Sequence, residues 1–66
     1  MKHFLFVEEI SGEQFIVEED NFSTAAMAAE GIATAIGQEY NGGEWELQFL
    51  CELTDEEAEA SGLDEY

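Results

Sequence analysis

The sequence predicts an α+β fold: a three-stranded, mostly antiparallel sheet, one main helix packed on one face and a short C-terminal helix. Residues 23–40 are rich in alanine, the best helix former, and residues 23–38 contain one acidic residue, Glu30, in a chain that has 17. Residues 2–10 and 13–19 are rich in the β-branched and aromatic residues that strands favour, and residues 44–53 alternate between apolar and polar residues as a half-buried strand does. These segments predict a single acidic domain that spans all 66 residues.

The long helix is expected to begin with Ser23 as its cap, because a serine hydroxyl can accept a hydrogen bond from an early backbone N–H. It is expected to end at Asn41-Gly42-Gly43, which tolerate a left-handed backbone. Gly31 is expected to permit a close backbone approach on the alanine-rich side. Spacings of three and four residues predict one apolar face. That face consists of Ala25, Ala28, Ala29, Ile32, Ala35 and Ile36.

A two-residue loop at Ser11-Gly12 is expected to join the first two strands, which would place Val7 opposite Ile16. The side chains expected to face the helix are Phe4, Phe6, Phe15 and Val17. Pairing of the third strand with the first makes every neighbour antiparallel and gives the order 2-1-3. A central first strand also explains why residues 4–7 are apolar on both faces. The alternative is the order 1-2-3 with one parallel pair.

The third strand alternates in hydropathy, which predicts one inward side and a buried, inert Cys51. The expected inward residues are Trp45, Leu47, Phe49, Cys51 and Leu53. Thr54 and Glu57 have the spacing of a capping box, which predicts a short helix over residues 55–61 that Gly62 ends. Residues 64–66 are expected to form a loose tail.

No motif of an enzyme is present, and no catalytic residue, metal site or cofactor is expected. The carboxylates occur in runs that are typical of a solvated face. One cysteine and one histidine match neither a disulfide nor a zinc-binding pattern. His3 is expected to be an ordinary, partly exposed residue near a fraying terminus. No segment fits a twelve-residue calcium loop.

The net charge of −16, with a single Lys, bounds the possible partners. Direct nucleic-acid binding is not expected, because phosphate contacts need Lys and Arg. An anionic membrane surface would repel the chain, and no apolar run is long enough to span a bilayer. A lone cysteine fits a reducing, cytosolic compartment. The charge favours a basic partner.

Short length, the absence of a catalytic motif and the one-sided charge together resemble the small acidic DNA-mimic proteins of bacteriophages. The resemblance covers the whole chain in character and involves no signature motif. It implies an inhibitor that occupies the DNA-binding surface of a basic host protein in the bacterial cytoplasm. An HU-type nucleoid protein is the favoured partner, because such proteins bind DNA largely without sequence preference.

The acidic runs around the predicted hairpin and at the start of the second helix are the expected contacts with this partner. They are Glu8, Glu9, Glu18, Glu19, Asp20, Asp55, Glu56 and Glu57. The alternative function is a small acidic interaction module for another basic protein, in which the charge serves mainly solubility. The sequence leaves the oligomeric state open.

Overall fold

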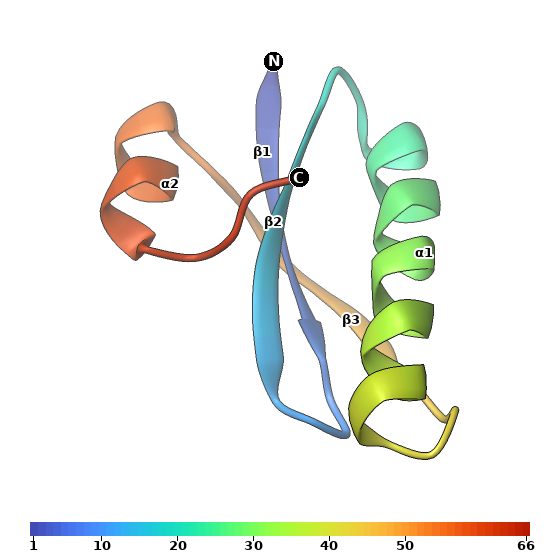
Figure 1. The fold of residues 1–66 in the computed structure, drawn as a ribbon. Coiled ribbons are helices and arrows are strands. Elements are labelled where there is room, and N and C mark those ends of the chain that lie inside the picture. The colour runs from blue at the N-terminus through green and yellow to red at the C-terminus, as the bar shows by residue number, and fades with distance from the viewer.

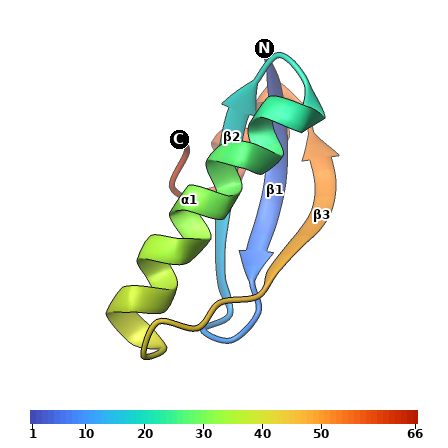
Figure 2. The same cartoon turned by 90° about the vertical axis from the view of Figure 1, so that its right-hand side faces the viewer.

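A computed structural model describes residues 1–66 and confirms the α+β class. The elements are β1 (Lys2–Glu8), β2 (Glu13–Glu19), α1 (Phe22–Tyr40), β3 (Leu47–Leu53) and α2 (Asp55–Ser61). The sheet has the order β2-β1-β3 with both pairs antiparallel, which confirms the 2-1-3 prediction over the 1-2-3 alternative. Figure 1 shows α1 and α2 on opposite sides of the sheet, and Figure 2 shows α1 lying diagonally across it.

The β1–β2 hairpin has a register two residues away from the predicted one. Phe6 pairs with Phe15 and Leu5 pairs with Ile16, so residues 9–12 form a four-residue connection. A shift by two residues leaves every side chain on the same face, whereas a shift by one would exchange the faces. The predicted helix-facing residues are therefore confirmed as core residues: Phe4, Phe6, Phe15 and Val17 are all buried.

The cap of helix α1 lies two residues earlier than predicted, because Asn21 is the cap instead of Ser23. The Asn21 Oδ1 atom accepts a hydrogen bond from the Thr24 N–H at 3.0 Å. This start makes Phe22 the first helical residue, and its ring packs against Phe49 with a centroid distance of 4.8 Å. The Phe22 ring also contacts Phe4 and Phe6, which anchors the first turn to the sheet.

The buried face of α1 differs in part from the predicted one, since Ala28 and Ala35 are exposed. The buried residues are Ala25, Ala29, Ala33, Ile36 and Gly37. An alanine-rich helix has apolar residues around most of its circumference, so its own sequence does not decide which side is buried. The anchoring of Phe22 selects the side, because residues 25, 29, 33 and 36 continue along the same face.

The close backbone approach expected at Gly31 occurs at Gly37. A Cβ atom at Gly37 would overlap the backbone carbonyl of Glu44 and lie 3.1 Å from the Cβ of Trp45. Gly31 is exposed, and nothing lies within 4 Å of the position a Cβ would take. The predicted helix end is confirmed: Gly42 and Gly43, which follow the cap residue, have φ angles of 66° and 96°.

Strand β3 contains an irregularity that reverses part of the predicted inward side. Phe6 pairs with Phe49 but Leu5 pairs with Cys51, so Leu50 is an extra residue in the strand. Leu47 and Phe49 therefore share the α1 face with Phe6, and Cys51 faces the opposite side. The cysteine is exposed, so the predicted buried thiol is wrong.

The C-terminus is more ordered than predicted. The capping box of α2 and its left-handed end at Gly62 are both confirmed. Residues 64–66, however, run along the outer edge of β2 and are not a loose tail. The Ile16 N–H donates to the Asp64 carbonyl at 2.9 Å, and the Glu18 N–H donates to the Tyr66 carbonyl at 2.8 Å. This segment covers the β2 edge of the sheet.

Glu8 is fully buried, and its carboxylate accepts four hydrogen bonds. Oε1 accepts from the Ser11 N–H and the Asn41 Nδ2, both at 2.8 Å. Oε2 accepts from the Glu46 N–H at 2.8 Å and from the Ile10 N–H at 3.1 Å. Burial acts to raise the pKa of Glu8, but the backbone N–H donors outweigh it and lower the pKa to about 2.

Alanine substitutions at the two glycines of α1 should change the free energy of unfolding in opposite directions. Gly31→Ala should raise the free energy of unfolding by about 1 kcal/mol, because alanine is the better helix former and the site is open. Gly37→Ala should lower it, since the added Cβ must displace the backbone at Glu44. Urea unfolding of both variants measures the difference. Equal stabilisation by the two changes would contradict the close approach at Gly37.

Glu8→Gln should destabilise the protein more than any acid-to-amide change at the surface. The glutamine side chain places an N–H₂ group among donors that need acceptors. Glu9→Gln, at the exposed neighbouring position, is the matched control. The folded-state pKa of Glu8 lies below the unfolded value. The ionised carboxylate therefore stabilises the fold above about pH 4.5, and this stabilisation is lost as the pH falls toward about 2.

Urea unfolding at neutral pH and in acid measures both effects of Glu8. The difference between wild type and Glu8→Gln should shrink as the pH falls through this range. A Glu8→Gln protein as stable at neutral pH as Glu9→Gln would refute the role given to the buried carboxylate.

Candidate functional site

The predicted partner-binding acids do not form one surface. Of the 17 acidic residues, 15 are exposed, Glu19 is half-buried and Glu8 is buried. Glu8 has no exposed surface to offer a partner, so its assignment as a contact is corrected. Glu9 lies at the hairpin turn, whereas Glu18, Glu19 and Asp20 lie at the other end of seven-residue strands, a separation of about 20 Å.

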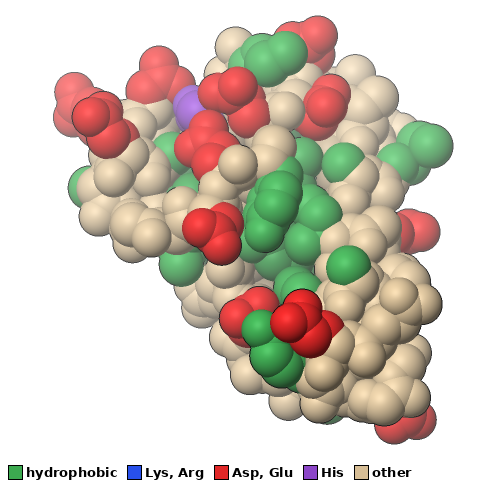
Figure 3. All heavy atoms as spheres, viewed as in Figure 1, with side chains coloured by type: hydrophobic (Ala, Val, Ile, Leu, Met, Phe, Trp, Pro, Cys, Tyr) green, Lys and Arg blue, Asp and Glu red, His purple; other side chains and the backbone are tan.

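The sheet brings the acids at the end of β2, which are Glu18, Glu19 and Asp20, together with those of α2. His3 pairs with Glu18 on one side and with Leu53 on the other, so β2 ends where α2 begins. Figure 3 shows acidic side chains gathered around the histidine at this end of the molecule. We name it the acidic end. It comprises Glu18, Glu19, Asp20, Asp55, Glu56, Glu57, Glu59 and Glu65.

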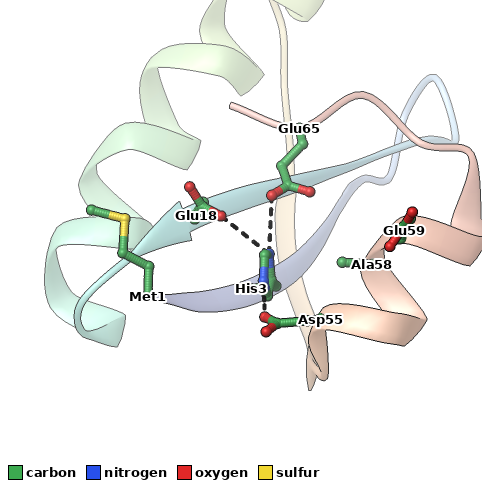
Figure 4. A pocket seen from close by; sticks show the side chains of 7 residues that line it. All are labelled: Met1, His3, Glu18, Asp55, Ala58, Glu59 and Glu65. Atoms are coloured by element: carbon green, nitrogen blue, oxygen red, sulfur yellow. Dashed lines mark hydrogen bonds and ion pairs between the residues drawn. The ribbon is translucent and has the colours of Figure 1, made fainter.

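His3 lies at the centre of the acidic end and is only 7% exposed. Its Nε2 atom is 2.6 Å from Asp55 Oδ1, and its Nδ1 atom is 3.0 Å from Glu65 Oε1 and 3.8 Å from Glu18 Oε2. The three carboxylates come from α2, the C-terminal segment and β2 (Figure 4). The prediction of an ordinary, partly exposed histidine is therefore wrong.

The carboxylates around His3 favour its charged form. The hydrogen bond with Asp55 is the largest effect and raises the pKa of His3 above 6.5. Burial lowers the pKa, but the charge and hydrogen bond of Glu65 add to the effect of Asp55 and outweigh burial. The His3 ring and the three carboxylates around it join two strands, a helix and the C-terminal segment.

A surface pocket of about 460 Å³ opens beside His3. Its lining consists of Met1, His3, Glu18, Asp55, Ala58, Glu59 and Glu65 (Figure 4). His3, Glu18 and Glu65 each offer one possible metal-ligand atom, and these atoms lie within 4.8 Å of one another. The sequence analysis missed Glu59 and Glu65 as members of this site. Residue 65 is 62 positions from His3, so no local spacing relates them.

The opposite end of the molecule carries a second group of acids, which we name the turn end. The Glu9 N–H donates to the Glu46 carbonyl at 2.8 Å, which places these two residues side by side. Repulsion from Glu39, and then from Glu13, raises the pKa of Tyr40. The turn end comprises Glu9, Glu13, Glu39, Glu44 and Glu46. The single Lys of the chain, Lys2, lies at the acidic end, opposite Glu19.

The outer edge of β3 is the third distinct surface. β3 is an edge strand: β1 pairs with one side of it, and no strand pairs with the other. Phe49 and Leu50 are 38% and 43% exposed, and Cys51 beside them is exposed too. We name Phe49, Leu50 and Cys51 the β3 edge.

No protein-family model matches the chain, and no curated protein or solved structure matches it. Neither α1 nor α2 combines the length and apolar character that a membrane-crossing helix requires.

His3→Gln should destabilise the protein most on the acid side of neutrality. The folded-state pKa of His3 is raised above the unfolded value of 6.5. The stabilisation of the fold by His3 is therefore complete below pH 6.5 and is lost as the pH rises through the folded-state pKa. Urea unfolding between about pH 6 and pH 9, with a chelator present, measures this.

The difference in stability between wild type and His3→Gln should shrink across that range. Glu30→Gln, which changes an exposed acid in the middle of α1, should show no such step. A constant difference between wild type and His3→Gln would show that protonation of His3 contributes nothing.

Proposed function

We propose that the protein is a DNA mimic, which occupies the DNA-binding surface of a basic host DNA-binding protein. The observation that carries this proposal is the density of exposed carboxylates along the molecule. The Cα trace is 34 Å long and the chain exposes 15 acidic side chains. A DNA duplex of that length carries about 20 phosphates. The two surfaces are therefore comparable in negative charge.

The placement of the acids supports a contact that extends along the molecule. The acidic end and the turn end lie at opposite ends of the β1–β2 hairpin. Glu30 is exposed between them on α1, and Glu52, which pairs with Phe4, is exposed on β3 close to the acidic end. A basic groove that follows the backbone of DNA would meet negative charge over the same length. Charge complementarity of this kind raises the association rate and makes it sensitive to salt.

An HU-type nucleoid protein is the favoured partner within this proposal. Proteins that bind DNA without base-specific contacts depend on backbone charge and on the shape of DNA. A mimic of such a ligand needs carboxylates at suitable spacing and needs no copy of base edges. The proposal places the protein in the cytoplasm of a bacterial host, where the nucleoid lies.

A small interaction module for another basic protein is the second candidate function, and the β3 edge favours it. The unpaired backbone groups of an edge strand can accept a further strand from a partner. Exposed Phe49 and Leu50 would add apolar contacts to such pairing. In that case the acidic coat would steer the partner, while the β3 edge would hold it.

A gel-shift titration tests the proposed function directly. An HU-type protein is bound to a labelled duplex, and the acidic protein is added over a salt series. We expect release of the DNA at low salt and weaker competition as salt rises, because salt screens charge attraction. Failure to release DNA at any salt would contradict the HU assignment. Failure across several non-specific DNA-binding proteins would contradict DNA mimicry.

Charge-neutralised variants locate the contact. Each triple variant should lower the association rate constant by about tenfold if its end takes part, with the fold intact. The variants are Glu9→Gln/Glu13→Gln/Glu39→Gln at the turn end and Asp20→Asn/Glu56→Gln/Glu59→Gln at the acidic end. Leu50→Ser is the corresponding variant of the β3 edge. Loss of binding in Leu50→Ser alone, without competition by DNA, would favour the interaction module.

A further inference from the structure

Both ring nitrogens of His3 face carboxylate oxygens, which limits the protonation states that fit the structure. Nε2 lies 2.6 Å from Asp55 Oδ1 and must carry a proton to make that hydrogen bond. Nδ1 lies 3.0 Å from Glu65 Oε1 and 3.8 Å from Glu18 Oε2. A neutral imidazole has one N–H, so the Nδ1 lone pair would then point at two negative oxygens. A second proton or a metal ion must occupy this position.

The spacing of the three atoms suits a metal ion. Zinc bound tetrahedrally at 2.0–2.1 Å from its nitrogen and oxygen ligands separates neighbouring ligand atoms by about 3.4 Å. The Nδ1–oxygen separations of 3.0 Å and 3.8 Å lie on either side of that value. Small side-chain rotations would bring all three atoms to zinc-binding distance.

The partner of the second ring nitrogen also matches a metal-binding histidine. Such a histidine donates its other N–H to a carboxylate or carbonyl, which fixes the ring orientation and increases the basicity of the ligating nitrogen. Asp55 occupies that position at Nε2. The His3 residue is only 7% exposed, so the ring is held in place by its surroundings, and it lines the pocket (Figure 4).

The backbone holds the two carboxylate ligands in place. Glu18 belongs to β2, and its N–H donates to the Tyr66 carbonyl at 2.8 Å. Glu65 forms a parallel β-bridge, through its backbone, with Ile16 of β2. The adjoining pocket of about 460 Å³ gives access from solvent and room for a water molecule as a fourth ligand.

We propose that His3 Nδ1, Glu18 and Glu65 bind one zinc ion, or a similar first-row divalent cation, with Asp55 orienting the histidine. The ion takes the place of the Nδ1 proton, which is released. Zinc fits this donor set better than magnesium or calcium, because those cations prefer oxygen ligands alone. The bound ion fastens the C-terminal segment to β1 and β2. This site is separate from the proposed DNA mimicry and does not depend on it.

Calorimetric titration of the whole chain with zinc chloride tests the site. Excess magnesium occupies the weak sites of the acidic coat, and a Cys51→Ser background removes the exposed thiol, which also binds zinc. We expect one equivalent of zinc to bind saturably and to raise the melting temperature. The control Glu30→Gln should bind zinc as the parent does.

Ligand variants then assign the site. His3→Gln and Glu65→Gln should lose saturable binding, and Asp55→Asn should weaken it by about 10–100-fold. If His3→Gln is unfolded, NMR on the folded parent gives the same answer. Zinc should shift the His3 ring signals and the amide signals of Glu18 and Glu65 at one equivalent.

Two results would overturn the proposal. One is zinc binding that leaves the His3 ring signals unchanged or is unaffected by His3→Gln. The other is the absence of saturable zinc binding. NMR should then show an N–H proton on both ring nitrogens of His3, because a second proton would supply the required positive charge.

Discussion

The buried carboxylate of Glu8 is the contact on which the turn end of the fold depends. Its four donors come from the hairpin turn, from Asn41 at the C-terminal end of α1 and from the segment that leads into β3. Removing a carboxylate from water is costly, and only a full set of donors makes it favourable. A chain with a net charge of −16 thus organises one end of its fold around a negative charge.

The other end of the fold meets the opposite electrostatic requirement. At the turn end, N–H groups surround one carboxylate; at the acidic end, three carboxylates surround one imidazole ring. The first arrangement is complete without an ion, whereas the second needs a positive charge on or beside Nδ1 of His3. The aromatic core between them joins the two ends, with Phe6 in contact with the rings of Phe15, Phe22 and Phe49.

These internal contacts separate the acids that support the fold from those that are free to meet a partner. Glu8 is used inside the protein, Glu57 caps α2, and Glu18, Asp55 and Glu65 are engaged by His3. The remaining exposed acids make no ion pair. They lie on strands, helices and short turns whose backbones are hydrogen-bonded, so their spacing is set before any partner arrives. A pre-organised acidic coat is what imitation of a stiff, charged ligand would require.

The sequence by itself determined the fold class, the length of α1, the faces of β1 and β2, and the capping box of α2. Each depends on propensity or on periodicity within a few residues of the chain. The sequence favoured the strand order 2-1-3 but left 1-2-3 open, and the pairing of β3 with β1 decided between them. Only the tertiary structure decided the hairpin register, the extra residue Leu50 and the pairing of residues 64–66 with β2. The same holds for the candidate site: runs of acids could be found in the sequence, but the association of His3 with Asp55 and Glu65 could not. Those contacts join residues more than 50 positions apart, and they arise because the sheet brings the start of β1, the end of β2 and the start of α2 to one place.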